Sequence, residues 1–449
     1  MKKKIEEKVK PLADLILEMH DPHCAWEAIK RLPAIVGLDF IFRTTPPELL
    51  DGVCDHYDKL MRGLFEKAII GKDLSDEEWE MAQLPAPVGW GMTPAWAKSL
   101  AGYTASLNSN MAEIQKVRND LLAPLELTLN KMVGIIKSHL PNNVNFTLTS
   151  KTKQKDIVEA LLKKRHVQFS EHMDIGVRIL YKQQNDRKAQ AIKTNKIKRG
   201  LHMDAAEFET FARRSLGVDL VSKPVKCLAC GEIADQKGDH DCRKNGAVIK
   251  RHNVVRDLYF DTAKEGFVEC KRENTLKFTR GGLASYRADL TFDNPIPGLT
   301  SKRTALDFTF HNANAQSYQK TAEKHQGALA LLGEKEKINK FKTALSENAW
   351  DFLPMGLEAM GYCSENCKDV AYYLIARKSI QKGVPFAETA SEFWHRLSFL
   401  IHQQVSRNIL NRYRRVSYNH SEEAEEEEEE EEKTFIISII SSNSVSIPK

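Results

Sequence analysis

The sequence contains no apolar run long enough to span a membrane. Its lysine-rich start, MKKKIEEKVK, leads into an amphipathic pattern and not into the continuous apolar core of a signal peptide. Cysteine is also scarce, with eight residues in a chain of 449, which argues against a disulfide scaffold and favours thiol or metal chemistry. We therefore expect a protein of the nucleus or cytoplasm with no membrane partner.

What is present is a globular composition, with 42% hydrophobic and 28% charged residues, in a chain long enough for two or three domains. The net charge of +5 hides an asymmetry, because residues 421–432 hold ten glutamates. Without them, 66 basic residues face 51 acidic ones, a surplus of about +15 that suits a polyanionic partner. The glutamate run cannot bury surface and repels itself, so residues 417–449 are predicted to be a disordered acidic tail.

Residues 1–145 have the apolar spacing of helices, with one buried face predicted at Leu12, Leu15, Ile16 and Met19. The stretch LSDEEW carries a capping-box pattern, and LPAPVGWGM predicts a loop. Residues 150–200 hold 14 Lys and Arg against 5 Asp and Glu. This basic stretch is equally consistent with a solvated helical linker and with a nucleic-acid surface.

A cysteine–histidine cluster lies in CLACGEIADQKGDHDC. It offers four ligands for a tetrahedral zinc ion: Cys227, Cys230, His240 and Cys242. Four protein ligands would make the site structural, with no open position for chemistry. The His-x-Cys half is unusually tight, and His252 is the nearest substitute if Cys242 cannot reach. A chance cluster is the alternative.

Two short strand-like runs, YRADLTF and ALDFTF, each carry a central aspartate. Alternation would place Asp289 with Thr291, and Asp307 with Thr309, on one face of each strand. The apolar residues would lie on the other faces: Ala288, Leu290 and Phe292 in the first run, and Leu306, Phe308 and Phe310 in the second. A buried carboxylate needs a cation or a metal as partner, whereas a strand-end aspartate can simply face water.

Other parts of a metal-dependent nuclease surround these aspartates. Glu269 lies on the preceding strand pattern GFVECKR, and Lys337 and Lys340 share one face of a later helix in EKINKF. Two carboxylates from adjacent strands can hold Mg²⁺, while a lysine orients the attacking water and offsets phosphate charge. Each lysine taken alone is better explained as part of a solvated helix face, and only its pairing with the aspartates favours a catalytic role.

From about residue 20 to 415, the chain resembles the C-terminal part of a non-LTR retrotransposon polyprotein that carries a restriction-enzyme-like endonuclease. The similar segments follow the family order: RTTPPELL, LSDEEW, QLPAPVGWGM, CLAC with GDH, RHN, RADL, LDFTF and EKINKF. In that family the endonuclease nicks DNA, and the exposed 3′ end primes reverse transcription. No Tyr-x-Asp-Asp polymerase motif occurs, so no polymerase active site is expected in this chain.

The resemblance implies an α/β fold of the PD-(D/E)XK type. In it, Asp289 and Asp307 would bind catalytic Mg²⁺, Lys337 would act in catalysis with support from Lys340 and Glu269, and His252 would lie beside phosphate or zinc. Zn²⁺ would be structural, and the partners would be DNA and possibly RNA. The Asp-x-Lys usual in such folds is missing, since Thr309 stands in the lysine position, and a lysine displaced to a later helix would account for this departure.

The expected domains are an α-helical thumb/connector-like region (1–145), a basic helical linker (146–220), a zinc knuckle (221–250) and an endonuclease-like α/β domain (251–416). The predicted protein is a retroelement-derived, Mg²⁺-dependent DNA-nicking fragment. One alternative is a non-catalytic nucleic-acid-binding remnant, and another is an interaction scaffold stabilised by zinc.

Overall fold

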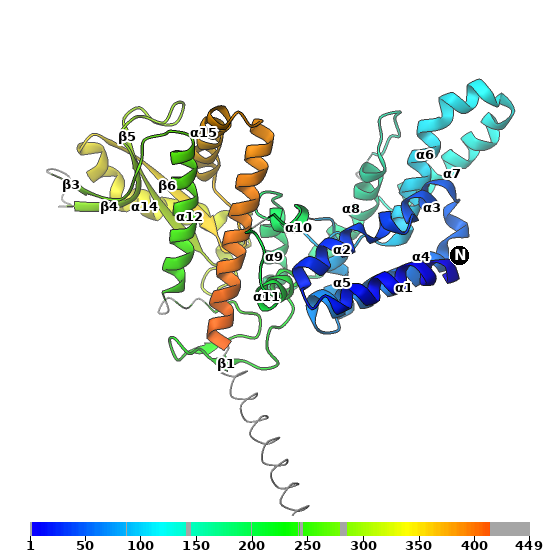
Figure 1. The fold of residues 1–449 in the computed structure, drawn as a ribbon, viewed down its shortest axis with the longest axis horizontal. Helices are drawn as coiled ribbons and strands as arrows, with labels where there is room; N and C mark the ends of the chain where they lie inside the picture. The colour runs from blue at the N-terminus through cyan, green and yellow to red at the C-terminus, as the bar shows by residue number, and fades with distance from the viewer. Residues whose placement is uncertain are drawn as a thin grey trace, which may run out of the picture.

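The computed structural model describes residues 2–86, 88–140, 145–198, 200–240, 242, 246–278 and 285–413, so the predicted acidic tail lies outside the described residues. It is a mixed α/β structure whose first part is helical (Figure 1). The elements of this part are α1 (Lys2–Glu18), α2 (Pro22–Ile35), α3 (Leu38–Thr44), η1 (Pro47–Leu49), α4 (Asp51–Phe65), η2 (Glu66–Ile70), α5 (Asp76–Gln83), α6 (Ala95–Val117), η3 (Asn119–Leu121) and α7 (Leu122–Ser138).

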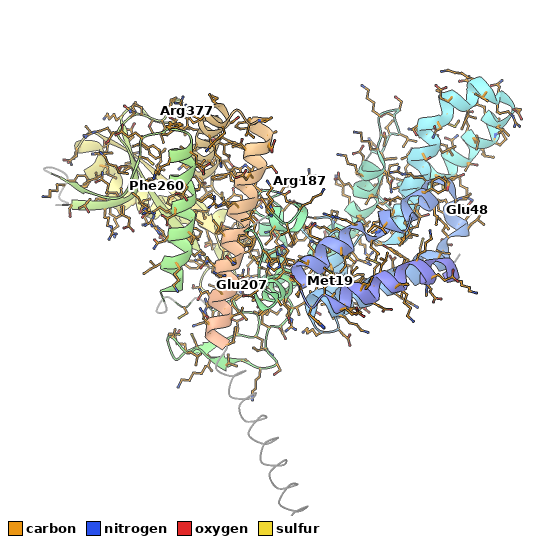
Figure 2. The ribbon with its side chains drawn as sticks, in the orientation of Figure 1. Met19, Glu48, Arg187, Glu207, Phe260 and Arg377 are labelled. Atoms are coloured by element: carbon orange, nitrogen blue, oxygen red, sulfur yellow. The ribbon has the colours of Figure 1, made fainter. Side chains whose placement is uncertain are left out.

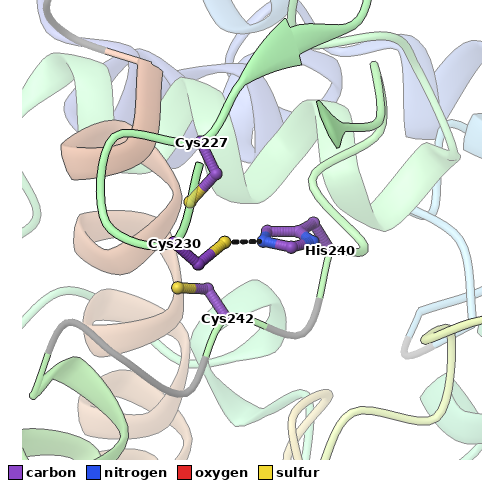
Figure 3. A group of neighbouring side chains, drawn as sticks. All are labelled: Cys227, Cys230, His240 and Cys242. Carbon is purple, nitrogen blue, oxygen red and sulfur yellow. Dashed lines mark hydrogen bonds between the residues drawn. The ribbon is translucent and has the colours of Figure 1, made fainter. Parts of the chain in front are cut away.

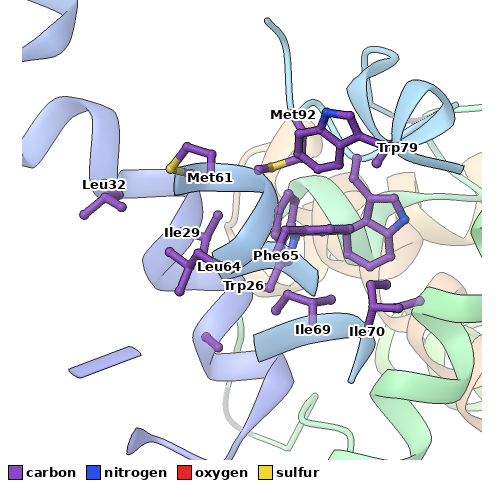
Figure 4. Close-up of a cluster of buried hydrophobic side chains, with 14 of the residues drawn as sticks. Trp26, Ile29, Leu32, Met61, Leu64, Phe65, Ile69, Ile70, Trp79 and Met92 are labelled. Atoms are coloured by element: carbon purple, nitrogen blue, oxygen red, sulfur yellow. The ribbon is translucent and has the colours of Figure 1, made fainter. Parts of the chain in front are cut away.

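An aromatic cluster forms the centre of the first core (Figure 4). The Trp26 and Trp90 rings meet edge to face with centroids 4.9 Å apart, and Phe65 lies 5.7 Å from Trp90. Trp90 comes from the predicted proline–glycine loop, so this loop supplies a core residue. The predicted capping box at Ser75 is confirmed, because its side chain accepts from the Glu78 N–H and the Glu78 carboxylate accepts from the Ser75 N–H.

Residues 146–220 form four helices: α8 (Gln154–His172), α9 (Ile175–Gln184), α10 (Ala191–Thr194) and α11 (Ala205–Leu216). Apolar residues of α8 pack with α6 and α7, and Phe208 and Phe211 of α11 lie in the first core. Within residues 146–220, which were expected to form a linker, α11 therefore packs as part of the helical region. Burial of its two phenylalanines provides the driving force.

The second part of the chain holds a two-stranded ribbon and a four-stranded sheet. Its elements are β1 (Val225–Lys226), β2 (Ile233–Ala234), α12 (Ala247–Glu265), β3 (Lys271–Lys277), β4 (Ser285–Phe292), β5 (Arg303–His311), α13 (Gln319–Ala322), α14 (Ala328–Glu347), β6 (Trp350–Glu358), α15 (Glu365–Lys382) and a final helix over residues 386–413. The sheet order is β3-β4-β5-β6, with antiparallel pairs except for the parallel β5–β6 pair. The crossover between these parallel strands contains α14, as a parallel connection requires.

Helices cover both faces of the sheet (Figure 1). On one face, α12, α15 and the 386–413 helix share a core with Leu306 and Phe308 of β5. On the other face, α14 packs with Ala305 of β5 and Ala288 of β4. The predicted alternation along β5 is thus confirmed, with its apolar residues behind and Asp307 on the α14 side.

The predicted alternation along β4 is wrong. Ala288 lies in the α14 core, whereas Leu290 and Phe292 lie in the α12 core on the opposite face. The β3–β4 pairing is interrupted at the same level, between the Arg272–Leu290 and Asn274–Ala288 pairs. Glu273, the β3 residue at this interruption, has φ +53°, and the change of face along β4 falls at Asp289.

Glu207 of α11 joins the helical part to the last helix (Figure 2). Its carboxylate, on a residue only 2% exposed, accepts from Gln403 Nε2 at 3.0 Å and pairs with Arg407. Glu207 also closes the capping box of its own helix with Asp204. A buried carboxylate held by several donors fixes the two parts together.

Candidate active site and metal cluster

The two predicted aspartates come together where β4 and β5 separate. The β4–β5 pairing ends at Leu290 and Leu306, and the next residue on each strand, moving away from the paired segment, is Asp289 or Asp307. Instead of a backbone partner, the Phe308 N–H donates to Asp289 Oδ2 at 2.7 Å. The Asp289 carboxylate also acts electrostatically on Asp307, so the two carboxyl groups lie close together. Adjacent strands therefore deliver a pair of acids to a single point.

Lys337 of α14 lies over this pair. Its Nζ is 2.5 Å from Asp307 Oδ2, and the lysine side chain is 31% exposed against 9% for the aspartate. The cation also lies 5.7 Å from the centre of the Phe341 ring. Lys337 is thus half-buried, held by its ion pair and by an aromatic face, and directed at the acid pair.

His252 of α12 approaches the pair from the opposite face of the sheet. Its Nε2 lies 2.9 Å from Asp289 Oδ2, and its Nδ1 is 3.3 Å from Asn253 Oδ1. The cysteine cluster does not need His252 as a substitute zinc ligand, because Cys242 lies close enough to the other three ligands. The histidine instead belongs to the aspartate pair.

The pKa values of the pair diverge. Burial raises the pKa of Asp307 to about 6, although the Lys337 ammonium opposes the rise and the Asp289 carboxylate adds to it. For Asp289, burial also acts upward, but His252 and the Phe308 N–H outweigh it, so the pKa is lowered. Burial lowers the pKa of His252, and its bond to Asp289 reverses this to a net rise. Two carboxyl groups in contact are thus balanced by two cationic partners.

The two remaining predicted residues lie outside this contact network. Lys340 is exposed and stacks on Phe341, with Nζ 4.9 Å from the ring centre. Glu269 is exposed just before β3, at the Lys271 end of that strand, whereas Asp289 lies level with Glu273. Among the described contacts, neither Lys340 nor Glu269 touches Asp289 or Asp307.

The sequence patterns did not reveal a third acid close to the site. Glu273, next to the break in the β3–β4 pairing, forms ion pairs with Arg256 of α12 and Arg287 of β4. Asp257 adds an acceptor for Arg256 at 2.9 Å. In the sequence, Glu273 stands in the charged run KREN, which interrupts a strand pattern and was the one available signal. Only the fold shows that the partners of Glu273 are arginines.

The cysteine cluster forms the second candidate site (Figure 3). The four ligand atoms, from Cys227, Cys230, His240 and Cys242, all lie within 4.8 Å of one another, so the cluster could bind a metal such as zinc. Gly231 has φ +79° and its N–H bonds to the Cys227 carbonyl at 2.8 Å, which makes the tight turn between the first two thiols. Burial acts to raise the pKa of Cys227, but backbone and thiol hydrogen bonds outweigh it and lower the pKa.

The final helix supports this cluster. Arg412 donates to the His240 carbonyl, and the Tyr413 hydroxyl donates to the Asp235 carbonyl at 2.5 Å. Gly238 also packs against the helix, since an added Cβ would lie 3.1 Å from Ile409 Cδ1. The ligand loop is therefore attached to the α/β core through residues 409–413.

No family model and no curated protein sequence matches this chain. Among the described residues, none of the helices combines the length and apolar character needed to cross a lipid bilayer. Function is therefore inferred from side-chain chemistry at the acid pair and the cysteine cluster.

Proposed function

We propose that this chain is a retroelement-derived, Mg²⁺-dependent endonuclease that nicks DNA in the nucleus, with a PD-(D/E)XK-like domain and a structural zinc knuckle. The observation that carries the proposal is the contact of three side chains from three elements. Asp289 and Asp307 meet at one point, and Lys337 Nζ lies 2.5 Å from Asp307. Two acids and a lysine are the set that metal-assisted phosphodiester hydrolysis needs.

The donor chemistry of the acid pair fits magnesium. Both Asp289 and Asp307 offer carboxylate oxygens, and Mg²⁺ is commonly held by one or two carboxylates together with water and phosphate oxygens. The pair is also buried, with side-chain exposures of 14% and 9%, so its negative charge requires a cation. When bound, magnesium would polarise a phosphate oxygen and acidify a coordinated water.

Three other side chains near the acid pair would have separate roles in the cleavage reaction. Lys337 would hold the attacking water beside Asp307 and offset phosphate charge. His252, with its pKa raised by Asp289, would donate a proton or a hydrogen bond on the other side of the pair. Arg287, whose side chain is 63% exposed on β4, would meet the DNA backbone.

A second feature favours a nucleic-acid partner. A groove of about 1160 Å³ in the helical part is lined by five cations, among other residues: Arg43, Lys98, Lys151, Lys153 and Lys155. Small polar residues such as Ser106, Ser109 and Asn110 line it too, and only two acids, Asp39 and Glu159, oppose the cations. A cationic polar groove matches a phosphodiester backbone, from DNA or possibly RNA.

A plasmid assay tests the proposal. Purified full-length protein with supercoiled plasmid and Mg²⁺ should produce nicked circles, and Asp307→Asn should abolish them. Asp293→Asn is the matched control. Asp293 directly follows β4, and its carboxylate forms an ion pair with Lys271 at 2.6 Å. Equal nicking by the wild type and Asp307→Asn would rule out the endonuclease.

The second candidate is a non-catalytic nucleic-acid-binding protein, favoured by one observation. His252 and Lys337 already neutralise the aspartate pair, so the three-element contact could serve as a structural ion network. This candidate predicts DNA or RNA binding that weakens steeply with salt, without a metal-dependent product. A chain that binds neither DNA nor RNA at low salt would instead be a zinc-stabilised scaffold.

A further inference from the structure

A second group of metal-binding side chains lies in the helical part, far along the sequence from the knuckle. One ligand atom from each of Asp21, Cys24 and His202 lies within 4.8 Å of the others. Two of these residues begin α2, and the third directly precedes Met203 in the segment that leads into α11. The proposed nuclease function uses none of them.

The first turn of α2 brings the carboxylate and the thiol together. Asp21 is the N-cap residue, and its Oδ1 accepts the Cys24 N–H at 3.0 Å. This cap holds the carboxylate over the first turn, with Oδ2 2.8 Å from His202 Nε2, and one carboxylate oxygen lies within 4.8 Å of the thiol. An N-cap aspartate with a histidine partner would be an ordinary ion pair, but the thiol adds a third, softer donor.

A buried histidine holds His202 in position. His23 is 1% exposed, its Nδ1 accepts the Met203 N–H at 3.2 Å, and its ring stacks on the His202 ring with centroids 5.4 Å apart. On its other face His23 stacks on Phe208 at 4.3 Å. The orientation of His202 therefore depends on the core, although its own side chain is 42% exposed.

We propose that Asp21, Cys24 and His202 form a zinc site that clasps the start of α2 to the segment before α11. A thiolate and an imidazole favour zinc over the hard cations Mg²⁺ and Ca²⁺. Three protein ligands leave the fourth tetrahedral position to water, unlike the closed knuckle. As zinc binds, the thiol proton of Cys24 passes to solvent, and the neutral imidazole of His202 carries its proton on Nδ1 in place of Nε2. The hydrogen bond from His202 to Asp21 is thereby replaced by two bonds to the metal.

Metal content tests this site. Full-length protein is equilibrated with buffered Zn²⁺ and measured by mass spectrometry of the metal, for the wild type, Cys24→Ser, His202→Gln and the control Cys270→Ser. Cys270 is a half-buried cysteine outside both clusters. We expect the Cys24 and His202 variants to hold one equivalent less than the wild type, whatever the knuckle holds, and the control to match the wild type.

Two further measurements sharpen the outcome. Asp21→Ser keeps a good N-cap while losing the carboxylate ligand, and should weaken zinc at this site about tenfold or more. With Co²⁺, the thiolate charge-transfer absorption of the wild type should fall in Cys24→Ser. Unchanged metal content in both the Cys24 and His202 variants would overturn the site. If Cys24→Ser does not fold, His202→Gln decides, because its side chain is partly exposed.

Discussion

Gly333 of α14 packs directly against Thr309 of β5, so closely that a Cβ on the glycine would lie 2.7 Å from Thr309 Cγ2 and 2.6 Å from His311 Nε2. One helical turn later, Lys337 lies over Asp307. A lysine at position 309 would have to share this face with the helix. The close packing of α14 therefore accounts for a lysine supplied by the helix and not by the strand.

Gly333→Ala should destabilise the protein by about 1–3 kcal/mol, because the added methyl overpacks the contact between α14 and β5. Gly134→Ala is the matched control, since its Cβ would meet nothing within 4 Å in α7, and should stabilise by about 0.5–1 kcal/mol. Urea unfolding measures both. A neutral Gly333→Ala would contradict the close approach.

Lys337→Met should reduce Mg²⁺-dependent nicking by about a hundredfold or more, because it removes the cation beside Asp307. Lys340→Met should have a smaller effect, since Lys340 is exposed and stacks on Phe341. Initial rates on supercoiled plasmid compare the two. A similar loss in both variants would mean that bulk positive charge matters and not the position of Lys337.

Glu358, at the end of β6, is expected to make stability depend on pH. Burial raises its pKa to about 7, although the N–H groups of Leu329 and Ala330 oppose the rise. A carboxyl with a raised folded-state pKa stabilises the fold at low pH, and this stability is lost as pH rises through 7. Glu358→Gln should thus match the wild type near pH 4 and exceed its unfolding free energy by roughly 2–4 kcal/mol at pH 8.

The measurement is urea unfolding of both proteins across this range. Comparing the two removes the opposite contribution of the buried histidines, such as His402, whose pKa burial lowers to about 3. Parallel stability curves for the two proteins would exclude Glu358 as the titrating group.

Removal of metal from the cysteine cluster should loosen the last helix. Arg412 and Tyr413 bond to the ligand loop, so a strong chelator or Cys230→Ser should speed hydrogen exchange over residues 405–413 and lower the melting temperature. Cys270→Ser serves as the control. Unchanged exchange after metal removal would mean that the loop holds its shape without an ion.

The sequence by itself determined features that depend on a few neighbouring residues. The capping box at Ser75 and the loop that ends in Gly91 are present as expected, because hydrogen bonds and φ preferences act over three or four positions. The alternation along β5 was also readable, since each side chain faces away from the one before it.

Burial of single residues was not readable from local spacing. Leu15 was expected in the buried face of α1 but is 59% exposed, whereas Lys193, in the basic stretch, is 1% exposed. Its Nζ bonds to Gln184 Oε1 at 2.5 Å and lies 5.2 Å from the Trp90 ring centre. These partners lie on other segments, so only packing could select them.

Which charged side chains make direct contact depends on how distant segments pack. The β3–β4 pairing is interrupted at the level of Asp289, α14 carries Lys337 to Asp307, and α12 carries His252 to Asp289. The physical reason is that the local sequence does not select the partner of a carboxylate. A partner becomes necessary only when burial removes the water around the charge. Its partner is then whichever cation the packing of distant segments brings within a few ångströms.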